Sequence, residues 1–259
     1  EDELIGEAAQ KLFEDAQVLL DKIVAEKWLT AKAVVGIFKA RSVEDDIALI
    51  DDNNNLICTL HHIRQQNKKV DGQANYCLSD FILPETSGKT DYLGAFAVSA
   101  GFNIEEKVAA FEAQHDDYNS ILLKALADRL AEAFAERMHE LMRKELWGYA
   151  KDENNSTEQL ISENYVGIRP APGYPACPDH TEKITLFNLL KVTENIGIQL
   201  TDSMAMYPAA SVSGWYFAHP EAKYFGTGKI GKDQVLDLAK RKNMSPEVME
   251  KWLSSNINY

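Results

Sequence analysis

The sequence predicts an α+β fold, with a twisted and largely antiparallel sheet and flanking helices, in a single large domain. Short segments rich in β-branched residues occur in groups, and long helical segments occur in groups of their own. A parallel, doubly wound sheet would instead show strands and helices in regular alternation. With 259 residues, of which 45% are hydrophobic, the chain can bury a sizeable core.

The first predicted element is a helix over residues 4–28. Its apolar residues recur at helical spacing and form one stripe: Ile5, Ala9, Leu12, Phe13, Ala16, Leu19, Leu20, Ile23 and Val24. Because the rest of the segment is acidic, this pattern is typical of an amphipathic helix that covers a core. Three short segments follow at 33–39, 47–50 and 56–60, separated by Asp, Asn and Ser residues that favour turns. They predict a meander.

Two more strands, 75–83 and 92–99, are predicted before a long helical region. Residues 103–147 are predicted as helix in two pieces, with a break near 114–117. The second piece is expected to bury Leu122, Leu126, Leu130, Phe134, Met138, Leu141 and Leu146.

In the C-terminal third, Thr181 is the expected N-cap of a helix that continues through the apolar run 184–190. The remaining predicted elements are strands at 204–207, 211–217 and 223–225 and helices at 232–242 and, capped by Ser245, 246–253.

Composition limits the class of protein. A formal net charge of -13 argues against nucleic acid as the partner, because phosphate binding needs a basic surface. No apolar run is long enough to span a membrane, and the acidic start, 1–3, is unlike a signal peptide. Cys58, Cys77 and Cys177 are odd in number and far apart, so we expect reduced thiols in a cytoplasmic protein. Without an initiator Met, the chain is expected to be a fragment of a longer polypeptide.

The segment 169–180 carries four of the eight prolines of the chain within nine positions. Each proline fixes its own φ and pushes the preceding residue toward extended geometry, so this segment is predicted to be a stiff, irregular loop. Such a loop can present carbonyls, the Arg169 guanidinium, the close approach of Gly173 and the Tyr174 ring to a small molecule at low ordering cost. A plain surface connection is the alternative; Arg169 and Tyr174 favour the binding site.

Other patterns have simpler explanations. Residues 226–231 spell G-x-G-x-x-G, but only 28 residues follow, with no returning strand, so a turn is favoured over a dinucleotide site. Residues 115–117, His-Asp-Asp, would point in different directions on a helix, which favours a helix break over a metal site. The two rings of 61–62, His-His, would face opposite sides of a strand. Cys177 and His180 have the spacing of half a zinc site, but no second half is visible in the sequence. The same two residues could form a nucleophile pair, but no third group is present to orient them.

The proline loop, Arg169-x-x-x-Gly173-Tyr174 followed by Pro-Ala-Cys-Pro-Asp-His, resembles the S-adenosylmethionine-binding loop of the reactivation domain of cobalamin-dependent methionine synthase. The similarity covers nearly the whole chain, in the same order. It includes 91–98 (DYLGAFAV), 111–118 (FEAQHDDY), 147–149 (WGY) and 211–217 (SVSGWYF).

The resemblance implies a ligand with a carboxylate, an ammonium, a sulfonium and an adenine. The residues expected to contact this ligand are Arg169, Ala171, Gly173, Tyr174, Tyr224, Phe225 and Glu132. Arg169 would clamp the carboxylate, and the Ala171 carbonyl would accept from adenine or ammonium. Two alternatives remain open. Arg169 could instead tie the loop to an acidic neighbour, and Tyr224 and Phe225 could be plain core aromatics. On sequence alone Glu132 is an exposed helix glutamate. In the family an additional N-terminal segment contributes an Asp, and we expect it to be missing here.

The function implied by the resemblance belongs to methionine biosynthesis. The domain would bind S-adenosylmethionine and position it for reductive methylation of cob(II)alamin, with an electron from flavodoxin or another flavoprotein. Cobalamin and zinc would be held by other domains of the parent methyltransferase, one of which, the cobalamin-binding domain, would be a partner. No catalytic side chain is implied, so the isolated chain is not expected to turn over. A free-standing methyltransferase and a purely structural interaction domain are the rival hypotheses.

A basic segment, 240–242, with Lys223, Lys229 and Lys232 nearby in sequence, is predicted to contribute to docking the flavoprotein. The alternative is a helix C-terminus, where cations interact favourably with the helix dipole.

Overall fold

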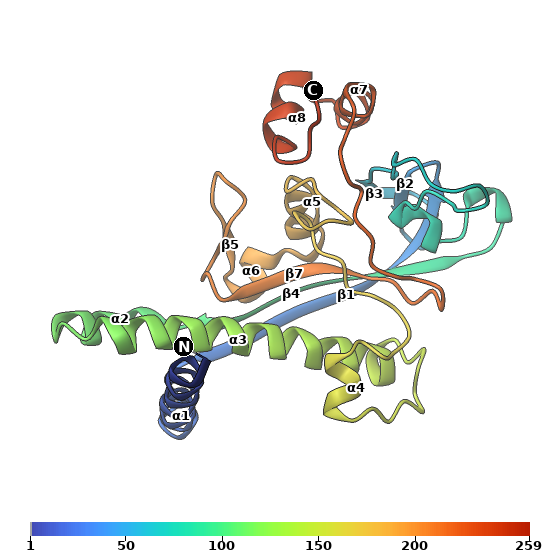
Figure 1. Cartoon of the computed structure of the whole chain (residues 1–259). Coiled ribbons are helices and arrows are strands. Elements are labelled where there is room, and N and C mark those ends of the chain that lie inside the picture. Colours follow the sequence, from blue (N-terminus) through green and yellow to red (C-terminus); the bar gives the residue numbers. More distant parts are fainter. Residues whose placement is uncertain (1) are drawn as a thin grey trace. The chain divides into compact units, whose positions relative to one another are not determined.

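The computed structural model describes residues 2–259, and side chains from residue 6 onward. It confirms the α+β class: the chain contains a five-stranded antiparallel sheet in the order β3-β2-β1-β4-β7, a two-stranded sheet, β5-β6, and α-helices (Figure 1). The side chain of Ile5, expected on the first apolar stripe, lies outside the described residues.

The chain forms two units, and the backbone of each is compact. The first unit comprises the residues up to Ala33 together with Val98–Arg137 and Ile196–Val212. The second unit comprises Val34–Ala97, Met138–Asn195 and Ser213–Tyr259.

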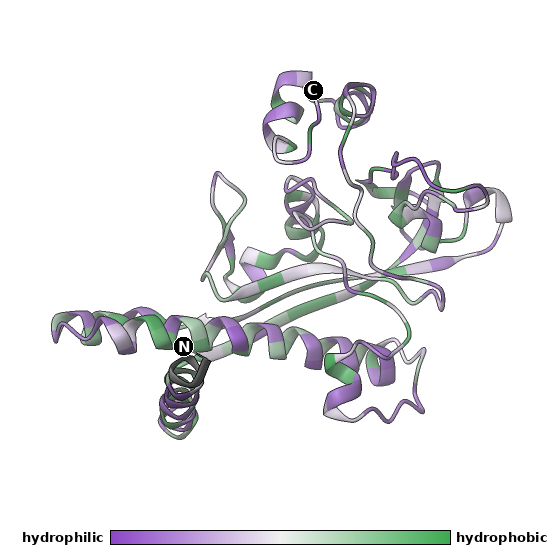
Figure 2. Cartoon of the chain, viewed as in Figure 1, coloured by the Kyte–Doolittle hydropathy of each residue, from purple (hydrophilic) through white to green (hydrophobic). Residues whose placement is uncertain are grey.

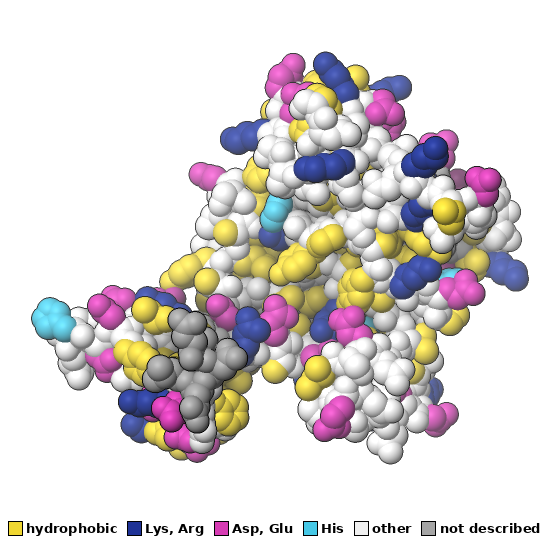
Figure 3. All heavy atoms as spheres, viewed as in Figure 1, with side chains coloured by type: hydrophobic (Ala, Val, Ile, Leu, Met, Phe, Trp, Pro, Cys, Tyr) yellow, Lys and Arg dark blue, Asp and Glu magenta, His cyan; other side chains and the backbone are white. Residues whose placement is uncertain are grey.

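The core of the first unit forms between helix α1, Asp2–Ala25, and helix α3, Asp117–Leu141. Leu19 and Ile23 of α1 pack with Leu122 and Leu123 of α3, and bands of apolar and hydrophilic residues alternate along α3 (Figure 2). The predicted apolar stripe on α1 includes residues that do not pack against the core. Leu12, Phe13 and Val24 are about half exposed or more, and hydrophobic side chains are visible at the surface around α1 (Figure 3).

The predicted helix break is confirmed between α2, Ile104–Ala113, and α3. His115 adopts a left-handed φ of 57°, which ends the first helix. The Asp116 carboxylate then accepts from the backbone N–H of Asn119 at 3.0 Å, which satisfies a donor in the first turn of α3. The 115–117 cluster is therefore a helix boundary.

The meander of the second unit is also confirmed. Strands β1, Thr30–Val43, and β2, Asp46–Ile50, pair antiparallel, and β2 pairs antiparallel with β3, Leu56–His61. The other strands of the large sheet are β4, Asp91–Phe102, and β7, Ser211–Tyr216.

Two C-terminal helices, α7, Lys232–Arg241, and α8, Pro246–Trp252, pack on each other in the second unit. Their shared core consists of Ile63, Ile230, Val235, Leu238, Ala239, Met249 and Leu253. Ser245 caps α8 as predicted, since its hydroxyl accepts from the N–H of Val248. Helix α5, Glu182–Leu190, begins directly after Thr181, as expected, and contacts β3.

Two predicted strands are wrong. Residues 75–83 contain a 3-10 turn, Leu78–Phe81, instead. The Asp80 carboxylate accepts from the N–H of Cys77 at 2.9 Å and from Arg64 at 2.7 Å, a local bond that competes with strand pairing. Residues 223–225 run as irregular chain, with the Tyr224 hydroxyl bonded to the backbone N–H of Arg169.

Several element boundaries also differ from the sequence prediction. Of 204–207 only β6, Met206–Tyr207, is strand, and it pairs with a segment that the sequence did not reveal, β5, Gln199–Leu200. Helix α3 ends in a wider π-helical turn, Met142–Leu146. The short helices α4, Thr157–Ile161, and α6, Val192–Ile196, were not predicted.

Candidate functional site

The proline loop is irregular, as predicted, and β7 anchors its first residues. Ile168 and Phe217 exchange two backbone hydrogen bonds of 3.1 and 3.0 Å. The Pro170 carbonyl accepts from the N–H of Trp215 at 3.0 Å. The loop therefore leaves a rigid strand at a fixed point.

A tight turn forms the middle of the loop. The N–H of Gly173 donates to the Cys177 carbonyl at 2.7 Å, and the N–H of Cys177 donates to the Tyr174 carbonyl at 2.9 Å. Gly173 has a φ of +93°, and a Cβ at this position would lie 2.3 Å from Cε1 of His180. Only glycine fits here. The Ala171 carbonyl is outside any strand ladder, as expected, but it accepts a turn bond from the N–H of Tyr174 at 3.2 Å, which leaves one lone pair for a ligand.

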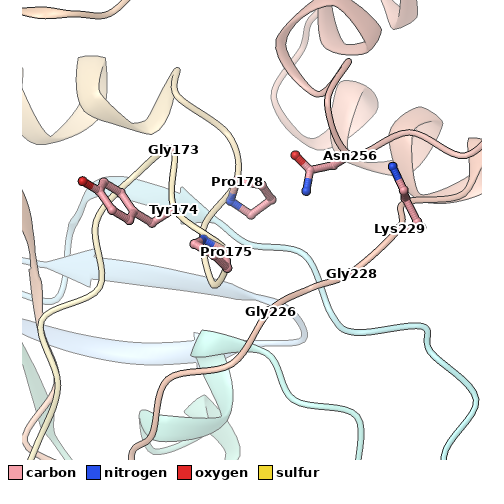
Figure 4. A pocket seen from close by; sticks show the side chains of 8 residues that line it. All are labelled: Gly173, Tyr174, Pro175, Pro178, Gly226, Gly228, Lys229 and Asn256. Carbon is pink, nitrogen blue, oxygen red and sulfur yellow. The ribbon is translucent and has the colours of Figure 1, made fainter. Parts of the chain in front are cut away.

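A second loop closes on the first. The N–H of Thr227 donates to the Pro175 carbonyl at 2.9 Å, and the Gln65 amide donates to the Gly226 carbonyl at 2.6 Å. The two loops line a cavity of about 440 Å³ whose walls are Gly173, Tyr174, Pro175, Pro178, Gly226, Gly228, Lys229 and Asn256 (Figure 4). In Figure 4 the Tyr174 ring extends away from Lys229 and Asn256.

The G-x-G-x-x-G segment is irregular chain with a bend at Lys229, without the strand that was predicted before it, and it also lines the candidate cavity. Sequence reasoning missed this second role, together with Lys229 and Asn256. The glycines of this segment were the available signal, because glycine is the usual residue where the backbone takes a left-handed φ or packs closely. Gly228 has a φ of +76°, and a Cβ there would lie 2.5 Å from the Asn67 amide.

Arg169 lies between two tyrosine hydroxyls. Its Nη1 donates to Oη of Tyr165 at 2.5 Å, and its backbone N–H donates to Oη of Tyr224 at 3.0 Å. The structure therefore brings Arg169 and Tyr224 together, although 55 residues separate them in sequence.

The other expected site residues occupy different surroundings. The Phe225 ring is half-buried in an aromatic cluster, 6.0 Å from Tyr76 and 6.4 Å from Phe81. Tyr174 is 62% exposed. Glu132 is exposed on α3 in the first unit, whereas the other six expected residues lie in the second unit.

Cys177 and His180 do not form a reactive pair. Burial raises the pKa of the Cys177 thiol well above its usual value, so the thiolate is disfavoured at neutral pH. All three cysteines are free. Burial also lowers the pKa of His62 to about 3, while His61 contacts Asp46 at 3.0 Å. Within residues 2–259, no group of three or more His, Cys, Asp or Glu side chains is arranged to hold a metal ion.

In the basic segment 240–242 only Lys240 is exposed, and the other two cations are paired within the chain, so the predicted docking role stays a prediction for Lys240. Nζ of Lys242 lies 2.5 Å from Oδ2 of Asp179 and 2.5 Å from Oε1 of Glu182, in a buried cluster. Arg241 pairs with Asp237 and Asp46. Over α7 and α8, Lys and Arg side chains are interspersed with Asp and Glu (Figure 3). Carboxylates distant in sequence pair with two of the three cations, and those that hold Lys242 are buried, which the sequence spacing could not reveal.

The fold and the paired loops define an α+β domain with a cavity at its loops. Comparison with known families gives its identity. Residues 1–243 match the family model described as "Vitamin B12 dependent methionine synthase, activation domain", so the chain belongs to this family and is a domain of a methyltransferase.

A solved structure agrees with this assignment. A crystal structure described as the MetH reactivation domain bound to AdoHcy superimposes with a TM-score of 0.94 and is 57% identical in sequence. The match covers 98% of this chain and 79% of that chain. None of the helices among the described residues is sufficiently long and apolar to cross a membrane.

Proposed function

We propose that this chain binds S-adenosylmethionine at the proline loop, 169–180, and positions it for reductive methylation of cob(II)alamin. The observation that carries the proposal is the solved relative at 57% identity, which holds AdoHcy. AdoHcy is S-adenosylmethionine without its transferable methyl group, so a site that holds one has the shape and polar groups for the other.

The residues of the loop fit this ligand. The Arg169 guanidinium suits a carboxylate, because its planar fork can donate two parallel hydrogen bonds. The Ala171 carbonyl keeps one lone pair for an amine. Gly173 allows close approach, and the cavity of about 440 Å³ lies in the range of small-molecule sites. Within the second unit the proposed contact residues are Arg169, Ala171, Gly173, Tyr174, Tyr224 and Phe225, of which Gly173 and Tyr174 line the cavity. The role of Glu132, in the first unit, stays a prediction from the family resemblance.

The contribution of this chain is binding and orientation. Cobalamin, held by another domain of the parent enzyme, supplies the methyl acceptor, with one electron from flavodoxin or another flavoprotein, and AdoHcy is the by-product. A ligand held rigidly places its methyl group along the line of attack, and this alone accounts for a large share of rate enhancement in such transfers. The buried Cys177 thiol takes no part in the transfer.

Calorimetric titration with S-adenosylmethionine tests the proposal. We expect one molecule bound per chain, and AdoHcy should compete for the same site. No heat of binding would favour the rival interaction domain. Methyl transfer to a small acceptor without any cobalamin protein would favour the rival free-standing methyltransferase.

A further inference from the structure

We propose that Tyr165 is a positioning residue that holds the Arg169 guanidinium ready for the ligand carboxylate. This inference rests on the proposed function, because it concerns the residue that is proposed to bind the carboxylate. Nη1 of Arg169 donates to Oη of Tyr165 at 2.5 Å. A hydrogen bond with an ionised donor is stronger and more directional than a neutral one, so this contact restricts a long side chain.

The Tyr165 ring is itself fixed on two sides. The guanidinium carbon of Arg143 lies 3.8 Å from the ring centroid, a close cation–π contact. The His139 ring meets it edge-on, with centroids 5.2 Å apart and an interplanar angle of 90°. The Tyr165 hydroxyl therefore cannot move independently of these neighbours.

Arg143 is in turn held in place by a buried ion pair. Its side chain is fully buried, and Nε and Nη2 each lie 2.9 Å from an oxygen of Glu153. Two parallel contacts fix the plane of the guanidinium as well as its position.

The other support reaches the large sheet at its β4–β7 edge. The His139 ring stacks on Tyr216 of β7 at 5.0 Å and 14°, and Tyr216 stacks on Phe96 of β4 at 4.5 Å. β4 and β7 are neighbouring strands. Burial, with Arg143 and Arg169 nearby, lowers the pKa of His139 well below its usual value, so the ring is neutral and adds no third cation to the cluster.

A continuous set of packed side chains thus runs from the sheet to Arg169. The consequence is a guanidinium that is ordered before the ligand arrives, so binding loses less side-chain freedom than it would with a mobile arginine.

Replacement of Tyr165 by Phe tests the inference, because it removes only the hydroxyl and keeps the stacked ring. We expect Tyr165→Phe to weaken S-adenosylmethionine binding about 5- to 20-fold, with an unchanged melting temperature. Tyr149→Phe is the matched control. Its hydroxyl lies in the same cluster, but it contacts Nε2 of His139, at 3.3 Å, where the Tyr165 hydroxyl contacts Arg169. Affinity should change less than about twofold in this variant.

A double-mutant cycle separates positioning from general structure. If Tyr165 acts through Arg169, adding Tyr165→Phe to Arg169→Ala should cause no further loss of affinity. An equal loss in both backgrounds would overturn the inference. Unchanged affinity in Tyr165→Phe, with weakened binding in Arg169→Ala, would also overturn it while leaving the proposed function intact. Unchanged affinity in Arg169→Ala would instead reject the proposed role of Arg169, and the positioning role with it.

Discussion

Gly173 is the residue on which the conformation of the proline loop depends most directly. Its left-handed φ of +93° and the 2.3 Å approach of His180 leave no room for a side chain. We expect Gly173→Ala to lower the free energy of unfolding by about 2–4 kcal/mol, through backbone strain and overpacking. Urea unfolding measures this loss.

Gly226 is the matched control for that experiment. It lines the same cavity, but a Cβ there would meet its nearest neighbour, Pro175, at an ordinary 3.6 Å. Gly226→Ala should therefore leave stability nearly unchanged. Equal losses in the two variants would contradict the assignment of Gly173 as a steric requirement.

Arg169 should matter for affinity rather than for folding. Removing a charge-assisted contact costs about 1.5–3 kcal/mol, so Arg169→Ala should weaken S-adenosylmethionine binding roughly 10- to 150-fold, with little change in melting temperature. Arg169→Lys keeps the charge but loses the planar fork, and should give an intermediate affinity. An affinity equal to that of the unchanged protein in Arg169→Ala would exclude Arg169 from the site.

The irregular loop of the candidate site could be predicted from residues with local signals. Prolines at four positions indicate a stiff loop, and Arg169, Gly173 and Tyr174 lie on it. The bond between the Arg169 backbone and the Tyr224 hydroxyl spans 55 residues, and no local pattern announces it. The same holds for the second wall of the cavity, which depends on how the 226–229 segment folds back on Pro175.

At the scale of elements, Lys242 joins the end of α7 to the start of α5. Burial alone would lower the pKa of Lys242, but Glu182 and Asp179 outweigh it and hold the pKa above its usual value. Burial raises the pKa of Glu182, which Lys242 partly offsets. One ammonium therefore stabilises two buried carboxylates.

Lys242→Met should remove that charge and leave two adjacent carboxylates without a cation. We expect a loss of about 3–5 kcal/mol at neutral pH, as for other broken buried ion pairs. Burial raises the pKa of Glu182, and without the ammonium its folded-state pKa would lie further above its unfolded value. A group of this kind stabilises the fold below its unfolded pKa and loses that contribution as pH rises through its folded pKa. Urea unfolding should thus show a smaller deficit at pH 5 than at pH 8.

Lys240→Met is the control, because Lys240 is exposed on the same helix. It should show little loss and no such pH dependence. A Lys242→Met deficit that is the same at both pH values would contradict the account of the cluster.

Prediction of the elements succeeded where periodicity was long and failed where side chains bond locally. The break before α3 and the Ser245 cap of α8 were visible in the sequence. The segment around Asp80 has strand-like composition, yet the bonds of its carboxylate to Cys77 and Arg64 produce a turn. Strand β5 has two residues and carries no pattern of its own.

At the scale of the whole molecule, the net charge of -13 would repel an acidic partner, and flavodoxin-type electron donors, the proposed partners, are acidic. Since Lys242 and Arg241 are paired internally, any docking patch at this end of the chain must use exposed lysines such as Lys240 and Lys232. We expect Lys232→Glu with Lys240→Glu to slow flavoprotein-dependent reactivation of the parent enzyme at low ionic strength, and salt should reduce the difference.

A double reversal on α1, Lys11→Glu with Lys22→Glu, makes the same change in net charge elsewhere. If both double variants slow reactivation equally, total charge explains the effect and these lysines form no docking surface.

We propose that this chain positions a methyl donor for an acceptor held by another domain. S-adenosylmethionine labelled in its methyl group tests it most directly, first with the chain alone and then with the cobalamin-binding domain and a reduced flavoprotein. We predict no transfer of label by the chain alone, to homocysteine or any other small acceptor, and transfer to cobalamin when all three proteins are present. Transfer of label by the chain alone, or none in the complete mixture, would contradict the account.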